Sequence, residues 1–240
     1  MRVDNKSIEA MILVGGKGSR LISVVNDRPK PMAEVAGRPF LEWLLIALQA
    51  QEVRRVILCT GHMGEKVEKY FGDGKLWNLE IQYSHEPAPL GTAGAVRNAL
   101  NLIENKQFLV LNGDSYCRLD LKRLVNSHIK KKASITMWLV NVDDCRRYGS
   151  VQIGKNGAVQ AFLEKSPVQS SGLINAGIYL MERDIGEAIP VGQAYSLETD
   201  FFPRFVGRGL YAVVGKPPFI DIGTPESFAS AGEIILQEDF

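Results

Sequence analysis

The sequence predicts an α/β fold built on a mostly parallel β-sheet with helices on both of its faces. In the first half of the 240-residue chain, short apolar runs alternate with segments whose apolar residues recur at helical spacing. The apolar runs are continuous rather than interrupted by polar residues, which is typical of strands buried on both faces of a parallel sheet. Strands that alternate with helices are likewise typical of α/β domains.

The expected elements of the first half follow one another in a regular order. Residues 55–60, Arg-Val-Ile-Leu-Cys-Thr, show the apolar run of a buried strand. Residues 39–51 show a helix with a proline in its first turn, where the missing N–H costs no hydrogen bond. The expected strands are 8–14, 55–60, 79–83, 107–111 and 134–140, and the expected helices are 39–51, 63–71, 92–102 and 121–132.

The second half of the chain contains more short strands. Residues 149–153 and 158–164 flank a Gly-Lys-Asn-Gly turn, which predicts a β-hairpin. A helix is expected at 196–206 with a break near Pro203, because proline cannot donate a helical hydrogen bond. The other expected elements are strands at 175–181 and 210–214 and a helix at 225–236.

The composition argues against several classes of protein. The 28 basic residues nearly balance the 27 acidic ones, so no charge excess attracts a nucleic acid or a membrane surface. The sequence contains no apolar run of transmembrane length and no signal peptide. The three cysteines form no Cys-x-x-Cys pair, which argues for a reducing compartment. We expect a single cytoplasmic domain over residues 1–240, and the sequence leaves open whether it forms a homo-oligomer.

A glycine-rich loop follows the first expected strand. It reads Gly15-Gly16-Lys17-Gly18-Ser19-Arg20, and Lys30 follows between two prolines. Glycines let backbone N–H groups approach an anion closely and the cations neutralise its charge, so the loop suits a polyphosphate. The spacing matches neither the Walker loop nor the dinucleotide fingerprint, and a strand followed by Gly-Gly-x-Gly is also a common tight turn.

Two aspartates are candidates for binding a divalent cation. Asp114 follows the fourth expected strand in Asn112-Gly113-Asp114, and Asp221 precedes the last expected helix. Ligands of open parallel sheets bind beyond the carboxyl ends of the strands, so Asp114 is expected at the same end of the sheet as the glycine loop. Mg²⁺ is usually held by one or two carboxylates together with substrate phosphates, which suits this pair. A turn or helix-capping aspartate is the alternative for Asp114.

Further candidate site residues lie at the ends of elements. Leu90-Gly91-Thr92-Ala93-Gly94 opens a helix with small side chains, against which a flat ring can lie, although a plain helix start capped by Thr92 gives the same pattern. Glu164-Lys165 ends a strand of the hairpin, and Asn175-Ala176-Gly177 begins the next strand. Glu198 lies in the first turn of a helix, where a solvated side chain is the alternative.

These motifs, in this order, resemble those of the sugar-1-phosphate nucleotidyltransferases over about residues 9–235. The resemblance rests on Gly-Gly-x-Gly-Ser-Arg with Lys-Pro-Met, Leu-Gly-Thr-Ala-Gly, Asn-Gly-Asp, Glu-Lys, Asn-Ala-Gly and Asp-Ile-Gly-Thr-Pro. It implies a Rossmann-like sheet of the nucleotide-diphospho-sugar transferase type. Within it, about residues 1–140 would form a nucleotide-binding half, and about 141–240 a hairpin-containing, sugar-binding half.

The resemblance also implies roles at the matching positions. Arg20 and Lys30 would be catalytic, and Asp114 and Asp221 would bind Mg²⁺ as the cofactor. The implied nucleotide-binding residues are Leu13, Gly15, Gly16, Gly18, Ser19, Arg20, Lys30, Leu90, Gly91, Thr92, Gly94, Asn112 and Gly113. The implied sugar-phosphate-binding residues are Gly149, Glu164, Lys165, Asn175, Gly177 and Glu198.

Two finer features point to one branch of that family. Leu-Gly-Thr-Ala-Gly-Ala looks like the guanylyl-transferring members, and residues 23–32 look like the heptose 1-phosphate guanylyltransferases. The implied substrates are GTP and D-glycero-α-D-manno-heptose 1-phosphate, for bacterial cell-surface polysaccharides, with no nucleic-acid or membrane partner. Residues 21–28 depart from the more widespread family segment, so no contact is assigned to them.

Other readings of the same motifs stay open. The chemistry suits mannose 1-phosphate with GTP, or glucose 1-phosphate with dTTP or UTP. A non-catalytic sugar-nucleotide-binding regulatory subunit is the alternative of a different class. Such subunits usually lose a metal carboxylate or a loop cation, whereas this sequence keeps both.

Overall fold

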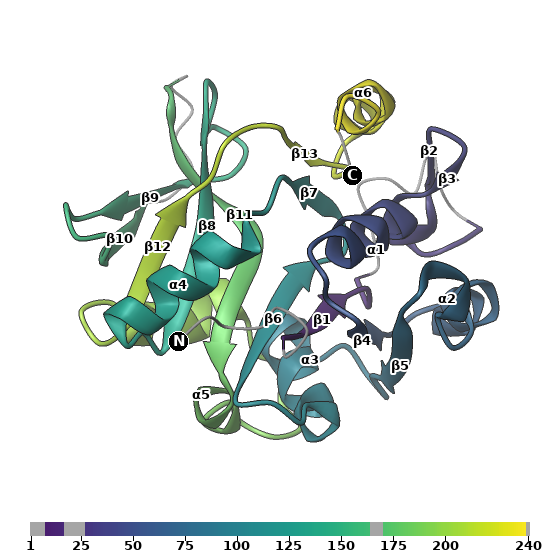
Figure 1. Cartoon of the computed structure of the whole chain (residues 1–240), viewed down its shortest axis with the longest axis horizontal. Helices are drawn as coiled ribbons and strands as arrows, with labels where there is room; N and C mark the ends of the chain where they lie inside the picture. Colours follow the sequence, from purple (N-terminus) through teal and green to yellow (C-terminus); the bar gives the residue numbers. More distant parts are fainter. Residues whose placement is uncertain (1–7, 17–26, 164–169, 239–240) are drawn as a thin grey trace.

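The computed structural model describes residues 8–16, 27–163 and 170–238, and its centre is a seven-stranded sheet (Figure 1). The strand order is β12-β8-β11-β6-β1-β4-β5. These strands are β1 (Glu9–Leu13), β4 (Arg55–Thr60), β5 (Glu80–His85), β6 (Gln107–Asn112), β8 (Ile135–Val142), β11 (Gly172–Glu182) and β12 (Leu210–Val214).

Helices cover both faces of this sheet. The α-helices are α1 (Phe40–Ala50), α2 (Gly64–Phe71), α3 (Gly91–Ala99), α4 (Leu121–Lys131), α5 (Arg183–Glu187) and α6 (Pro225–Ile235). Side chains of α1, α2, α4 and α6 pack in one core with Ala10 and Ile12 of β1, whereas α3 packs in a second core with Met11. Successive side chains of β1 thus point to opposite faces, which explains why its sequence is continuously apolar.

The direction of the strands defines where a ligand can bind. Strands β5, β4, β1 and β6 are parallel, and the chain passes from β1 outward to β4 and β5 before β6 adds on the other side of β1. The strand order therefore reverses between β1 and β6, and in open α/β sheets ligands bind beyond the carboxyl ends of the strands at such a switch point.

Most of the expected elements are present, with bounds that shift by a few residues. The strands expected at 55–60 and 210–214 have those bounds, and the expected hairpin is β9 (Ser150–Ile153) with β10 (Val159–Leu163). The helix expected at 196–206 is a π-helix, η6 (Leu197–Phe201), followed by a 3₁₀-helix, η7 (Phe202–Phe205). The break falls just before Pro203, as the missing N–H requires.

Several short or reversed elements were not predicted. β11 runs antiparallel to both of its neighbours, β6 and β8, in an otherwise parallel sheet. The unpredicted elements are α5 and the small pairs β2 (Glu34–Val35) with β3 (Arg38–Pro39) and β7 (Ser115–Cys117) with β13 (Phe219–Asp221). The remaining short helices are η3 (Lys30–Met32), η4 (Lys75–Trp77) and η5 (Leu100–Leu102). Two- and three-residue strands are too short to show a period.

Among the described residues, no helix has the length and apolar composition that crossing a membrane requires.

Candidate active site

The first glycines of the loop lie at the switch point of the sheet. Val14 donates its N–H to β4 at 2.9 Å, and Gly113, after β6, donates to the carbonyl oxygen of Leu13 at 3.0 Å. Gly15 packs closely on the chain after β4, because a Cβ on Gly61 would lie 3.2 Å from Gly15 Cα. The loop therefore begins between the carboxyl ends of β1, β4 and β6.

Lys30 and Asp114 form an ion pair at this end of the sheet. Lys30 Nζ donates to Asp114 Oδ2 at 2.6 Å, although the two residues are 84 positions apart. Lys30 is held in place by η3, whose Pro31 and Met32 are buried. The Lys30 side chain is 13% exposed and that of Asp114 is 42% exposed, so the carboxylate is open to a ligand. Asp114 Oδ1 also accepts a weaker bond from Ser115 Oγ at 3.3 Å.

The backbone brings Asp221 next to Asp114. Strand β13 pairs antiparallel with β7, so that Asp221 lies opposite Ser115. The N–H of Ile222 donates to the carbonyl oxygen of Asp114 at 2.9 Å. The two candidate metal ligands, which are far apart in the sequence, therefore lie on adjacent paired segments.

The carboxylate of Asp221 is more occupied than that of Asp114. Arg147 Nη2 donates to Oδ1 at 2.9 Å and to Oδ2 at 3.0 Å. The N–H of Gly223 donates to Oδ1 at 2.8 Å, and the hydroxyl of Tyr148 donates to Oδ2. Burial, followed by the hydrogen bond to Asp221, raises the pKa of Tyr148 well above its ordinary value, so its hydroxyl stays protonated.

The two carboxylates of Asp114 and Asp221 suit Mg²⁺ better than a metal ion whose ligands all come from the protein. Within the part of the chain that the structure describes, no group of three or more His, Cys, Asp or Glu side chains could hold a metal. Mg²⁺ needs only one or two carboxylates, because water and substrate phosphates complete its octahedral shell. Asp114 and Asp221 provide two carboxylates, which agrees with this requirement. That both bind the metal remains our prediction.

The predicted base-binding segment forms the start of α3 and is hydrogen-bonded to the segment before η6. Gly91 has φ +69°, and a Cβ there would lie 2.6 Å from the carbonyl oxygen of Tyr195. That oxygen accepts the N–H groups of Ala93 at 2.9 Å and Gly94 at 3.2 Å. These two N–H groups are therefore committed to the protein, and a base would have to be recognised by other groups nearby.

A hydrogen-bonded network joins α3 to the predicted sugar site. Thr92 Oγ1 donates to Glu198 Oε2 at 2.8 Å and provides no side-chain cap for α3, so the helix-cap alternative for Thr92 is wrong. The hydroxyl of Tyr179 donates to Glu198 Oε1 at 3.3 Å and accepts from Asn175 Nδ2 at 2.7 Å. Glu198 is half-buried and accepts a third bond from Ser196 Oγ at 3.0 Å, so it is not a solvated side chain.

Tyr179 was missed by the sequence analysis. Its side chain is fully buried, and this burial, reinforced by the nearby carboxylate of Glu198, raises its pKa well above the ordinary value. It joins two residues that the sequence assigned to the sugar. Its place in a continuous apolar strand gave no signal that its hydroxyl would face the site.

Gly177 and Asn112 meet where β11 and β6 pair. Gly177 has φ +74°, and a Cβ there would lie 2.8 Å from Asn112 Nδ2. The pairing of β11 with β8 shifts its register between Asn175 and Ile178, so the strand is irregular at Gly177. Asn112 Oδ1 is buried and accepts no hydrogen bond from the described residues, so it is an unsatisfied acceptor at this end of the sheet.

Glu86 is a second residue that the sequence analysis missed. A Cβ on Gly15 would lie 2.4 Å from Glu86 Oε1, and Glu86 Oε2 accepts the N–H of Leu90 at 3.0 Å. Burial raises the pKa of this carboxyl group, although the hydrogen bond from Leu90 opposes the shift. Glu86 thus lies between the predicted phosphate loop and the predicted base segment. Its position four residues before Leu90 was the available signal.

Five predicted site residues lie outside the described part of the chain: Gly18, Ser19, Arg20, Glu164 and Lys165. Their roles remain predictions. Gly16 lies at the end of the described loop and is exposed, and Gly149 has φ +69° at the end of the loop that follows β8.

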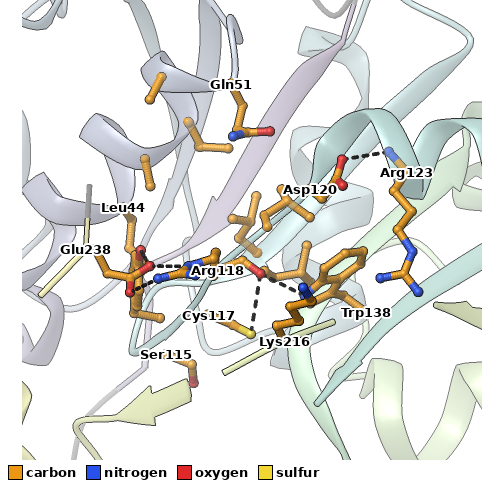
Figure 2. Close-up of a pocket in the computed structure, with 17 residues that line it drawn as sticks. Leu44, Gln51, Ser115, Cys117, Arg118, Asp120, Arg123, Trp138, Lys216 and Glu238 are labelled. Carbon is orange, nitrogen blue, oxygen red and sulfur yellow. Dashed lines mark hydrogen bonds and ion pairs between the residues drawn. The ribbon is translucent and has the colours of Figure 1, made fainter. Parts of the chain in front are cut away.

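A cavity of about 470 Å³ adjoins the site on the face covered by α1 and α4 (Figure 2). Its lining includes Ser115 but none of the ion-paired residues Lys30, Asp114 and Asp221. Inside it, Arg118 forms an ion pair with Glu238 at 2.6 Å, and the guanidinium of Arg123 lies 5.9 Å from the ring centre of Trp138. The cavity is thus a neighbour of the candidate site rather than the site itself.

The fold and this cluster of residues define a class of enzyme. The chain belongs to the nucleotidyl transferase family, which matches residues 9–238. The family resemblance and the α/β fold predicted from the sequence are therefore confirmed.

Two individual relatives are similar to this chain over most of its length. The chain is 38% identical, over 225 residues, to D-glycero-α-D-manno-heptose 1-phosphate guanylyltransferase of Aneurinibacillus thermoaerophilus, covering 93% of this chain and 96% of that protein. It is 39% identical, over 224 residues, to mannose-1-phosphate guanylyltransferase of Mycobacterium tuberculosis, covering 92% of this chain but only 62% of that protein.

A solved structure agrees with both comparisons. A crystal structure of HddC from Yersinia pseudotuberculosis, complexed with GMP-PN, matches with a TM-score of 0.84 and 38% sequence identity. The match covers 94% of this chain and 98% of that chain. The overall fold of this chain is therefore shared with a relative solved in complex with GMP-PN.

Proposed function

We propose that this protein transfers a guanylyl group from GTP to D-glycero-α-D-manno-heptose 1-phosphate, giving GDP-D-glycero-α-D-manno-heptose and pyrophosphate. The observation that carries this proposal is the ion pair of Lys30 and Asp114, 2.6 Å apart at the switch point, with Asp221 on the adjoining segment. The similarity to the Aneurinibacillus thermoaerophilus enzyme, which extends over nearly the full length of both proteins, supports this choice of substrates.

Glu86 supports guanine as the base. Guanine presents two adjacent donors, its ring N–H and its exocyclic amine, whereas uracil and thymine present one N–H between two acceptors. An ionised carboxylate only accepts hydrogen bonds and can accept two at once. We propose that the oxygens of Glu86, which lie near Gly15 and Leu90, accept both guanine donors.

The main obstacle in this reaction is electrostatic. Two unit negative charges about 4 Å apart repel by roughly 4 kcal/mol at an effective dielectric constant near 20. Within the described part of the site, Lys30 would offset this repulsion between the two substrates. Arg20 and Lys165 are the further cations that we predict. When bound by Asp114 and Asp221, Mg²⁺ would supply Lewis-acid neutralisation of the phosphate oxygens.

The reaction needs no general base. The nucleophile is an oxygen of the sugar phosphate, which is already ionised at pH 7 because the second pKa of a phosphate monoester is about 6. That oxygen forms a bond to the α-phosphorus of GTP while the bond from the α-phosphorus to the bridging oxygen breaks. Pyrophosphate leaves with those electrons, and Lys30 stabilises the charge on the transferred group. The displacement is in line, with inversion at phosphorus.

The second substrate would lie near the network of Asn175, Tyr179 and Glu198. These side chains are joined by hydrogen bonds of 2.7 Å and 3.3 Å, which orients the polar groups before a sugar arrives. We propose Asn112 Oδ1, which the family resemblance assigns to the nucleotide, as a further acceptor for a sugar hydroxyl. We place the reaction in the cytoplasm, because Cys59, Cys117 and Cys145 are all buried free thiols, which suits a reducing compartment.

A substrate panel tests this function. We expect the highest kcat/KM for GTP with the heptose 1-phosphate, measured as pyrophosphate release with Mg²⁺ and checked by the mass of the product. Mannose 1-phosphate with GTP is the second candidate, favoured by the 39% identity to the Mycobacterium tuberculosis enzyme. A preference for UTP or dTTP, or no turnover with any pair, would contradict the proposal.

A further inference from the structure

The two candidate metal carboxylates differ in what already binds them. Asp114 has one cationic partner, Lys30, which contacts only Oδ2. Asp221 has Arg147, whose Nη2 lies 2.9 Å from Oδ1 and 3.0 Å from Oδ2. A divalent cation approaching Asp221 from solvent would meet oxygens that a guanidinium already shares, so the two cations compete for one carboxylate.

Arg147 is held in a way that allows it to leave. Its side chain is 43% exposed, whereas that of Asp221 is 13% exposed. Ion pairs with so exposed a partner contribute little to stability, because water solvates the separated charge. The guanidinium also lies 5.2 Å from the ring centre of Tyr148, a contact that keeps it near the site.

The position of Arg147 in the chain places it close to the region where we expect the second substrate. It lies in the loop after β8, two residues before Gly149, which we predict to contact the sugar. A sugar phosphate would bring a doubly charged anion to this region. Guanidinium groups bind phosphate through paired hydrogen bonds, so the incoming phosphate is a stronger partner than one shared carboxylate.

We propose that Arg147 moves from Asp221 to the phosphate of the sugar substrate, so that binding of this substrate releases Asp221 for the divalent cation. This inference rests on the proposed function. The coupling is reciprocal, because whatever factor the sugar phosphate adds to metal affinity, the metal adds to sugar-phosphate affinity. Arg147 then acts as a positioning residue that delays complete assembly of the metal site until the nucleophile is present.

Metal binding without turnover tests the proposal. Free Mn²⁺ is titrated by electron paramagnetic resonance against the full chain, with and without D-glycero-α-D-manno-heptose 1-phosphate and without nucleotide. Arg147→Ala should bind Mn²⁺ alone about two- to fivefold more tightly, the factor expected from loss of an exposed ion pair. The sugar phosphate should tighten Mn²⁺ binding by the wild type, and this effect should disappear in Arg147→Ala.

The neighbouring arginine provides a matched control. Arg146 pairs with Asp144 at 2.9 Å, so Arg146→Ala removes the same charge from the same loop without freeing Asp221. It should behave as the wild type in both titrations. Asp221→Asn should weaken Mn²⁺ binding and should abolish any further effect of Arg147→Ala, and thermal unfolding checks that each variant is folded.

The possible failures can be told apart. If Arg147→Ala binds Mn²⁺ no more tightly than the wild type, or keeps the response to sugar phosphate, the proposal for Arg147 is wrong. If the wild type releases no pyrophosphate from GTP and the heptose 1-phosphate, the proposed function is wrong instead. The Mn²⁺ titration without sugar still decides whether Arg147 competes for Asp221.

Discussion

The two ends of the central sheet both carry charged clusters, but the clusters differ in how their partners are supplied. At the amino end, Glu9 is buried and accepts hydrogen bonds from Arg55 and from the backbone N–H groups of Glu104 and Asn105, the latter two at 2.9 Å and 2.7 Å. Its partners come from the neighbouring strand and the turn beneath it, and the Glu9 side chain is itself buried, so this carboxylate is closed to a ligand.

At the carboxyl end the charged groups are only partly committed. Asp114 is 42% exposed, and among the described residues its ion-pair partner is Lys30 alone. Asn112 Oδ1 is buried there without a protein partner among those residues. The comparison teaches that a charged cluster does not by itself mark a functional site. Exchangeable partners and unused acceptors do, because a ligand can replace or satisfy them.

The largest expected effect on stability lies at the amino end of the sheet. Glu9→Ala would remove the carboxylate that Arg55 and two backbone N–H groups share, leaving buried donors without an acceptor. We expect a loss of roughly 3 kcal/mol in the free energy of unfolding, measured with urea. Turnover per folded molecule should be unchanged. A Glu9→Ala variant that is stable but inactive would contradict our view that the amino-end cluster is structural and the carboxyl-end cluster functional.

The second prediction concerns base recognition by Glu86 at the carboxyl end of the sheet. Glu86→Gln keeps the size of the side chain but replaces one acceptor oxygen with a donor, so it should no longer accept both guanine donors. We expect the ratio of kcat/KM for GTP to that for UTP to fall about tenfold or more, as loss of a charge-assisted hydrogen bond implies. Glu65→Gln, an exposed change on α2, is the matched control. An unchanged ratio would remove Glu86 from base recognition.

The smallest expected effect is a pH dependence of the free energy of unfolding, caused by a histidine at the amino end of the sheet. His128 is buried between Thr136 Oγ1 at 2.8 Å and Glu182 Oε1 at 3.1 Å, and burial lowers its pKa despite the opposing contact with Glu182. A lowered folded-state pKa means that the unfolded chain takes up the proton first. This contribution to stability is complete above the unfolded pKa of about 6.5 and is lost as the pH falls from there.

The measurement for His128 is a urea midpoint at several pH values between 8 and 5. The wild type should lose up to about 1.4 kcal/mol per pH unit below the unfolded pKa through this group, and His128→Gln should lose less. Turnover should not follow this titration, since His128 lies at the end of the sheet opposite the site. Equal losses in both proteins would show that His128 is not the group responsible.

Sequence reasoning was strongest where one local pattern had one structural solution. Continuous apolar runs such as residues 55–60 had to be buried strands, and parallel strands had to bring Gly15 and Asp114 to one end of the sheet. The family motifs then pointed to the correct class of enzyme. The strand direction of β11 could not be derived in this way, because an apolar strand is equally buried in either direction.

The contacts that decide the chemistry were harder to predict. The pairing of Lys30 with Asp114 spans 84 positions and depends on how η3 packs. Arg147 lies in a loop whose charges resemble a solvated surface, and its contact with Asp221 depends on the two short strands β7 and β13. Such contacts arise from tertiary packing and have no local period, so no window of sequence contains them.

The most direct test of the central claim is the rate of pyrophosphate release by Lys30→Ala, with GTP, the heptose 1-phosphate and Mg²⁺. Lys75→Ala is the control, because Lys75 pairs with Asp73 at 2.6 Å on the exposed surface. Lys30→Ala should lower kcat by on the order of 10²–10³, with unchanged circular dichroism and unfolding midpoint, whereas Lys75→Ala should keep wild-type turnover. A folded Lys30→Ala protein with nearly wild-type turnover would contradict this claim.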